Sequence, residues 1–282
     1  MSNLKHIGWV GFGRFGLPAA LNLLEQGFHL TAFELFNRGT KSIIEAVKQG
    51  AVRSEIPECT GIDALILCLP KSEDVLQVLD YFGDNVPPLI IDLTTADPSV
   101  TYTLHEQYKY KDTLFVDCPV SGTKQNARNG ELTVFVGYEE KRNALLDELL
   151  KYIGKNIYYF DSPGKGNYAK LINQFIHLSN MAIIREGLMM ANAIKLDPQL
   201  LVDALSNSSA NSAMMQRFGR KVVEEDYSTD FSLALAFKDL NLVHDMVSDL
   251  SLNLNFESIT LNTYKKTYEK GFGDKNFTII CK

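Results

Sequence analysis

A long, mostly apolar segment over residues 168–194 carries a stripe of polar side chains that could move a proton. A helix places residues three, four and seven positions apart on one face, and a helix this apolar is expected to be buried between layers. A solvated helix face is the alternative. Because burying a charged amine is costly, and because burial favours the neutral amine, we interpret the stripe as lining a polar cleft at a domain junction. The stripe consists of Lys170, Asn173, Gln174 and His177.

Within this stripe the lysine is the residue best suited to acid–base work. A partly desolvated amine can accept and return a proton near neutral pH, so we assign proton transfer to Lys170. A lone histidine on an apolar helix is more often packed in the core, and we therefore leave His177 out of the catalytic set.

A glycine-rich turn near the start of the chain is typical of nucleotide binding. It follows the apolar run His6–Val10 and precedes a helical stretch. In such a turn the first glycine allows a tight bend, the second lets the backbone approach a pyrophosphate, and the third lets helix and strand pack closely. The helix N-terminus then points its N–H groups at the phosphates. An accidental glycine turn is the alternative. The predicted cofactor-binding residues here are Gly11, Phe12, Gly13, Arg14, Phe15 and Gly16.

Glu34 follows the next predicted strand, at the position that distinguishes NAD from NADP. An acidic side chain there accepts hydrogen bonds from the ribose hydroxyls and repels a 2′-phosphate. Leu35 comes next, where an NADP enzyme often carries arginine, although Arg38 lies close enough to permit some use of NADP. The sequence therefore predicts NAD as the cofactor, with NADP tolerated.

The elements that position these residues alternate between short apolar runs and helical stretches. Nearly unbroken apolar strands are typical of a parallel sheet that helices cover on both faces, so we expect an α/β fold with a doubly wound, Rossmann-type sheet. After the loop at 162–166 the chain reads as helix, and Leu196-Asp197-Pro198 should stop the long helix Tyr168–Ile194. We therefore expect a Rossmann-type domain over 1–162 and an all-helical substrate and oligomerisation domain over 163–282. The predicted strands are His6–Val10, His29–Phe33, Ala64–Leu69, Pro88–Leu93, Leu114–Cys118, Leu132–Gly137 and Asn156–Phe160, and the predicted helices include Phe15–Gln26, Ser42–Gln49 and Ser72–Tyr81.

Composition narrows the classes of partner. The net charge of −6 argues against nucleic acid as the main partner, because phosphate binding needs a cationic surface. We find no apolar run long enough to span a membrane. The cysteines form no CxxC pair and have no histidine at metal-ligand spacing, which indicates a reducing, cytoplasmic location and no metal site. The four are Cys59, Cys68, Cys118 and Cys281.

With these motifs in view, the chain resembles the β-hydroxyacid dehydrogenase family, which includes 3-hydroxyisobutyrate dehydrogenases and tartronate semialdehyde reductases. The resemblance runs over essentially the whole chain, and the motifs follow the family's order. They are the glycine turn with Pro18, Leu69-Pro70, Asp92-Leu93-Thr94-Thr95 with Pro98, Asp117-Cys118-Pro119-Val120-Ser121-Gly122-Thr123, the segment from Gly164 to Gln174, Phe231 with Lys238-Asp239-Leu240, and Gly273-Asp274.

The resemblance implies reversible hydride transfer between NAD and a short 3-hydroxy acid or semialdehyde, with Lys170 and Asn173 as the catalytic residues. It implies cofactor contacts from Leu69, Pro70, Thr95 and Lys238, and substrate contacts from Ser121, Gly122, Thr123 and Gln174. Two departures concern the pocket: Phe15 stands where methionine is usual, and Thr123 replaces a glycine. They leave the identity of the substrate open.

Three other readings remain. An imine reductase shares this architecture but carries another residue at the catalytic position; a cofactor-binding scaffold would have lost the lysine; and a phosphogluconate-type dehydrogenase has a longer C-terminal region. Lys170, Asn173 and Lys238 favour the hydroxyacid enzyme. A helix with apolar residues on most sides needs several partners, so we also expect a homodimer or homotetramer.

Overall fold

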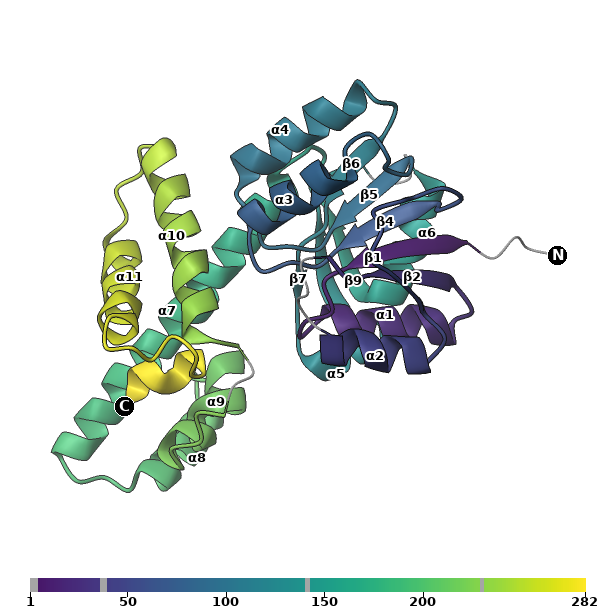
Figure 1. The fold of residues 1–282 in the computed structure, drawn as a ribbon. Coiled ribbons are helices and arrows are strands. Elements are labelled where there is room, and N and C mark those ends of the chain that lie inside the picture. The colour runs from purple at the N-terminus through teal and green to yellow at the C-terminus, as the bar shows by residue number, and fades with distance from the viewer. Residues whose placement is uncertain (1–4, 36–39, 140–142, 229–230) are drawn as a thin grey trace. The chain divides into compact units, whose positions relative to one another are not determined.

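A computed structural model describes residues 5–35, 40–139, 143–228 and 231–282 (Figure 1). The chain divides into two compact units, residues 1–170 and 171–282. The first holds a parallel sheet with helices and the second is helical, which confirms the predicted fold class. The division falls inside helix α7 (Lys165–Ala193), so the first turns of this helix belong to the first unit.

The sheet of the first unit has six strands in the order β3-β2-β1-β4-β5-β6, and every neighbouring pair is parallel. The strand order reverses between β1 and β4, and ligands of doubly wound sheets bind at such a point, beyond the carboxyl ends of the strands. The glycine turn follows β1 there. The strands are β1 (His6–Val10), β2 (His29–Phe33), β3 (Val52–Ser54), β4 (Ala64–Leu67), β5 (Leu89–Asp92) and β6 (Leu114–Asp117).

Helices cover both faces of this sheet because its strands are apolar on both sides. Helices α3 and α4 lie on one side of the sheet, and α1 and α2 lie on the other (Figure 1). The side chains of α3 and α4 belong to one core cluster, and those of α1, α2 and α6 belong to a second. Asp97 begins α4 by accepting a hydrogen bond from the backbone N–H of Ser99 at 2.8 Å. The helices are α1 (Gly16–Glu25), α2 (Thr40–Lys48), α3 (Ser72–Phe82), α4 (Pro98–Lys109), α5 (Lys124–Arg128) and α6 (Ala144–Ile153).

A second, three-stranded sheet lies in the same unit. It consists of β7 (Val120–Ser121), β8 (Leu132–Val136) and β9 (Gly154–Tyr159), with β7 antiparallel to β8 and β9 parallel to it. The predicted strands 132–137 and 156–160 therefore exist, but they form a sheet of their own. This sheet pairs Ser121 with Thr133, which fixes the end of the segment that leads to Gly122.

The second unit packs helices around an apolar core. Tyr264 is fully buried, and its hydroxyl donates a hydrogen bond to the Leu178 carbonyl at 3.1 Å. Arg185 donates from Nε to the Ile280 carbonyl at 2.7 Å, which fastens the C-terminal 3₁₀ helix to α7. Among the described residues, no helix has the length and apolarity that crossing a membrane requires. The elements after α7 are α8 (Pro198–Ser206), α9 (Ala213–Val223), α10 (Leu233–Asp249), α11 (Asn255–Tyr268) and the 3₁₀ helix η1 (Phe277–Cys281).

Candidate active site

The three glycines of the turn differ in what a side chain would meet. A Cβ on Gly11 would overlap the Cys68 carbonyl, and a Cβ on Gly16 would overlap the Gly11 carbonyl. Gly11 also has a φ of 96°, which disfavours any other residue. A Cβ on Gly13 would meet nothing within 4 Å, so this glycine opens onto space. Bend, open approach and close packing are the three features that a pyrophosphate site requires.

Helix α1 begins at Gly16, the last glycine of this turn. No side chain accepts a hydrogen bond at its N-cap, Phe15. The indole N–H of Trp9 donates to the Gly11 carbonyl at 2.9 Å, which holds the turn against the end of β1. The N-terminus of α1 can therefore present backbone N–H groups to an anion.

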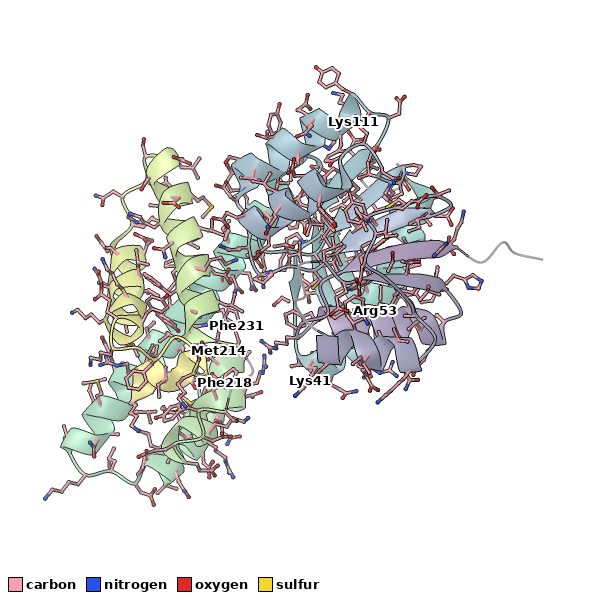
Figure 2. All side chains as sticks on the ribbon, in the orientation of Figure 1. Lys41, Arg53, Lys111, Met214, Phe218 and Phe231 are labelled. Carbon is pink, nitrogen blue, oxygen red and sulfur yellow. The ribbon has the colours of Figure 1, made fainter. Side chains whose placement is uncertain are left out.

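Glu34, which follows β2, has a partner that the sequence did not suggest. Its side chain is 1% exposed, and Arg53 on the neighbouring strand β3 places Nε 2.6 Å from the Glu34 Oε2. Figure 2 labels Arg53. Arg53 also reaches Glu55 Oε1 with Nη2 at 2.7 Å. The two acids and Arg53 thus form a chain of ion pairs at the end of β2. Arg38 lies outside the described residues.

The loops after β4 and β5 are tied to each other. The Thr94 hydroxyl accepts a hydrogen bond from the Leu69 backbone N–H at 3.0 Å, and the Thr94 N–H donates to Asp92 Oδ1 at 2.9 Å. Leu69, Pro70 and Thr95 therefore lie on joined loops at the carboxyl ends of adjacent strands. The glycine turn packs against the end of β4 beside these loops, because a Cβ on Gly11 would overlap the Cys68 carbonyl.

A buried clamp fixes the first turn of α7. Asp117, at the end of β6, accepts hydrogen bonds from the backbone N–H groups of Gly164 (3.0 Å) and Asn167 (2.8 Å). The Asn167 side chain accepts from the Ala96 N–H at 2.9 Å and donates to the Thr101 hydroxyl at 3.1 Å. This Asp117–Asn167 clamp joins the start of α7 to β6 and to the loop that carries Thr95.

Burial raises the pKa of Asp117 to about 6, against the opposing effect of the backbone N–H groups that donate to it. Lys170 follows one helical turn after Asn167 and is 5% exposed, and Gln174 is buried as well. A helix face in contact with solvent would leave both side chains exposed, so the solvated face is not what the structure shows for these two residues. The apolar Ile172 and Ile176 are instead exposed, so the expectation that this helix is buried between layers does not hold for this face of it in the single chain.

The Ser121-Gly122-Thr123 segment runs from β7 into α5. The Thr123 hydroxyl accepts from the Asn126 N–H at 3.0 Å, and the Asn126 side chain accepts from the Thr123 N–H at 3.0 Å. These two bonds form a capping box at the start of α5, and Thr123, which stands where the family has glycine, is its N-cap residue. A Cβ on Gly122 would lie 2.7 Å from a methyl group of Leu132, so glycine is also needed here for packing.

The remaining predicted residues form a hydrogen-bonded chain in the second unit. Lys238 Nζ lies 2.7 Å from Asp239 Oδ1, and Gln174 Nε2 donates to Asp239 Oδ2 at 2.6 Å. Asn173 Nδ2 donates to Gln174 Oε1 at 3.1 Å. Asp239 is 3% exposed and joins α7 to α10. Our site prediction omitted this aspartate, although its place beside Lys238 in a recognised motif could have drawn attention to it.

His177 belongs to an aromatic cluster. Its ring centroid lies 5.4 Å from that of Phe277 and 6.5 Å from that of Phe231, which Figure 2 labels. These contacts agree with our interpretation of His177 as a packed residue.

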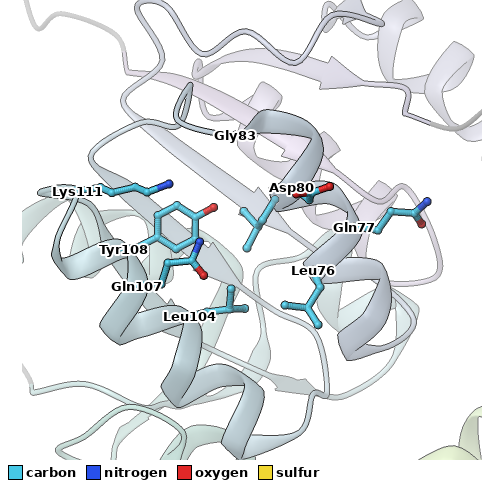
Figure 3. Close-up of a pocket in the computed structure, with 9 residues that line it drawn as sticks. Leu76, Gln77, Asp80, Gly83, Leu104, Gln107, Tyr108 and Lys111 are labelled. Atoms are coloured by element: carbon cyan, nitrogen blue, oxygen red, sulfur yellow. The ribbon is translucent and has the colours of Figure 1, made fainter.

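A hollow of about 500 Å³ lies elsewhere in the first unit, between α3 and α4 (Figure 3). None of the predicted site residues lines it, so it is a separate feature. Among the described residues there is no group of three or more His, Cys, Asp or Glu side chains that could hold a metal ion. The lining residues of the hollow are Leu76, Gln77, Leu79, Asp80, Gly83, Leu104, Gln107, Tyr108 and Lys111.

Comparison with known proteins assigns both parts of the chain. Residues 6–160 match the NAD-binding domain of 6-phosphogluconate dehydrogenase, and residues 164–282 match a model described as NAD-binding of NADP-dependent 3-hydroxyisobutyrate dehydrogenase. The mitochondrial 3-hydroxyisobutyrate dehydrogenase of Mus musculus is 30% identical over 99% of this chain and 87% of its own length.

Solved structures share the fold. A 3-hydroxyisobutyrate dehydrogenase from Salmonella typhimurium superposes with a TM-score of 0.90 at 24% identity, covering 98% of this chain and 99% of its own. The imine reductase of Streptomyces aurantiacus superposes with a TM-score of 0.66 at 16% identity, covering 98% of both chains. At these identities the superpositions show the architecture alone.

Proposed function

Because the chain belongs to the β-hydroxyacid dehydrogenase family and binds NAD(P), we propose that it transfers a hydride reversibly between NAD(H) and a short 3-hydroxy acid or its semialdehyde. The substrate named for the mouse relative, 3-hydroxyisobutyrate, is the first candidate. Glycerate and 4-hydroxybutyrate, with their aldehydes, are the next. The preference for NAD rests on Glu34 and Leu35, and a kcat/KM with NADPH equal to or above that with NADH would contradict it.

The observation that carries this proposal is a buried lysine one turn beyond the Asp117–Asn167 clamp. A bound nicotinamide supplies the hydride chemistry. Lys170 takes the hydroxyl proton on Nζ during oxidation and returns it to the carbonyl oxygen during reduction. The clamp holds the first turn of α7, so the amine is positioned before substrate arrives.

Substrate binding is assigned to polar residues of the recognised motifs. Ser121 and the backbone around Gly122 hold the carboxylate, with Thr123 shaping the loop through its capping box. Asn173 and Gln174 orient the reacting oxygen. Lys238 adds a positive charge that attracts the acid and contacts the cofactor, and Asp239 positions it through their ion pair.

Replacing Lys170 by alanine tests the assignment. The change should lower kcat by about 10² or more, the usual loss on removing a general acid–base, with the Kd for NADH unchanged. Lys165→Ala is the matched control, because Lys165 is an exposed lysine in the first turn of the same helix. Normal turnover in Lys170→Ala would contradict the proposed role.

The substrate is tested with a panel of short hydroxy acids and semialdehydes, each assayed with NAD(H) and NADP(H). A cyclic imine forms a separate arm. Reduction of the imine without turnover of any hydroxy acid would favour the imine reductase alternative. Binding of dinucleotide without any turnover would favour the scaffold.

We also propose that the enzyme forms a homodimer or homotetramer through α7. Four exposed apolar residues recur along one face of this helix, and such a face usually packs against another chain. A monomer by light scattering would contradict this, and Ile183→Glu should dissociate the oligomer. The residues of the exposed face are Ile172, Ile176, Ile183 and Met190, and the exposed Ile194 follows the end of the helix.

The free cysteines support a reducing, cytoplasmic location.

A further inference from the structure

The carboxylate expected to select NAD is held by a cation on the next strand. The backbone N–H of Glu34 donates to the Ser54 carbonyl at 2.9 Å, which brings the end of β2 level with Arg53 and Ser54 on β3. The Arg53 Nε then lies 2.6 Å from Glu34 Oε2. Any ribose that approaches Glu34 therefore also approaches Arg53.

The two side chains differ in accessibility. The Glu34 side chain is 1% exposed, whereas that of Arg53 is 43% exposed. A buried carboxylate needs a charged partner, and Arg53 supplies one. The exposed part of the guanidinium remains within reach of a ligand. Its planar fork of N–H donors matches the oxygens of a phosphate.

We propose that Arg53 is a second determinant of cofactor choice, which binds the 2′-phosphate of NADP and permits the chain to use NADP beside NAD. This inference rests on the proposed dinucleotide site at the glycine turn. Glu34 alone would repel a 2′-phosphate, because both are anionic. Contact with Arg53 compensates the charge of Glu34, so the repulsion is reduced, and the second acid that Arg53 contacts, Glu55, is largely exposed to solvent.

The position of Arg53 explains why the sequence analysis, which predicted NAD with NADP tolerated, did not name this residue. An NADP enzyme often carries an arginine directly after the acidic position, and there the chain has Leu35. The cation comes instead from the adjacent strand, through the parallel pairing of β2 and β3.

The test is equilibrium binding of NADH and NADPH to Arg53→Gln, followed by nicotinamide fluorescence. We expect the ratio of the NADPH Kd to the NADH Kd to rise about tenfold over the wild-type ratio, which corresponds to losing one partly exposed charge-assisted contact. Both cofactors are measured on the same preparation, so a general loss of folded protein cancels in the ratio. Titration with 2′,5′-ADP and ADP should show the same change without a nicotinamide.

Glu55→Gln is the matched control, because it removes the other partner of Arg53 and leaves the contact with Glu34 in place. Its ratio should stay near the wild-type value. An unchanged ratio in Arg53→Gln, or an equal rise of both dissociation constants, would overturn the inference while leaving the dinucleotide site intact. Failure of the wild type to bind either dinucleotide would overturn the proposed site itself. All of these measurements are equilibrium binding titrations, so their outcome does not depend on whether the protein turns over a hydroxy acid.

Discussion

Gly13→Ala separates the fold of the glycine turn from its proposed binding role. A Cβ at this position meets nothing within 4 Å, and its φ lies outside the left-handed region. Alanine therefore fits the folded backbone and restricts the unfolded chain, which should raise the free energy of unfolding by about 0.4–1 kcal/mol. The same change at Gly11 or Gly16 would force a methyl group onto a backbone carbonyl and should destabilise the turn.

The added methyl group of Gly13→Ala enters the space that a pyrophosphate needs. The second glycine of such a turn allows the backbone to approach the phosphates, and a hydrogen bond to a charged group contributes about 1.5–3 kcal/mol. Loss of one such contact corresponds to a rise in the Kd for NADH of between about tenfold and a hundredfold. A more stable protein with weaker cofactor binding is thus the expected combination.

Two measurements check this combination. Denaturant unfolding gives the free energy of unfolding, and fluorescence titration gives the Kd for NADH. Gly187→Ala, in α7, is the matched control because its Cβ also meets nothing within 4 Å, and it should leave the Kd unchanged. An unchanged Kd in Gly13→Ala would refute the placement of the pyrophosphate, and a clear loss of stability would refute the open geometry.

Three further variants or conditions test the rest of the site. Asn167→Ala leaves the buried Ala96 N–H without its acceptor, so it should cost about 1–3 kcal/mol of stability and lower kcat more than it raises KM; a change in KM alone would contradict positioning of Lys170. The pKa of Asp117 is raised in the folded state, from 3.8 to about 6, so the stability due to this group is full below pH 3.8 and lost as the pH rises through about 6. The free energy of unfolding should therefore fall by up to about 3 kcal/mol between pH 4 and 7 relative to Asp117→Asn, in denaturant titrations of both proteins, and a parallel pH dependence would refute this. Burial raises the pKa of Cys118 well above its ordinary value, so its thiol should react with a disulfide reagent at pH 8 only as the chain unfolds; rapid reaction of the native protein would contradict its burial.

The sequence predicts the parts of this fold that have strong local patterns. Continuous apolar runs identify β1, β2 and β4, and the stop at Leu196-Asp197-Pro198 agrees with the end of α7 at Ala193. Two short strands were not predicted. β3 has three residues, Val52 to Ser54, and β7 has two, and neither has enough residues to show a period. Both are held by pairing with strands elsewhere in the chain.

The same distinction applies to the site. The glycine turn and Lys170 have local signatures, because a turn and a helical stripe are read from neighbouring positions. The partner of Glu34 on β3 and the contacts of Asn167 depend on which strands and loops meet. No local pattern specifies these contacts, although the residue types that make them are visible in the sequence.

Arg53 also helps to protect the edge of the sheet from pairing with strands of other molecules. β3 is the edge strand beside β2, and an edge strand presents unpaired backbone groups to which a foreign strand can add. Val52, at its start, is 65% exposed and would favour such addition. The brevity of β3 and the charges of Arg53 and Glu55 oppose it. A mutation chosen to alter the cofactor would therefore also remove part of the chain's protection against aggregation.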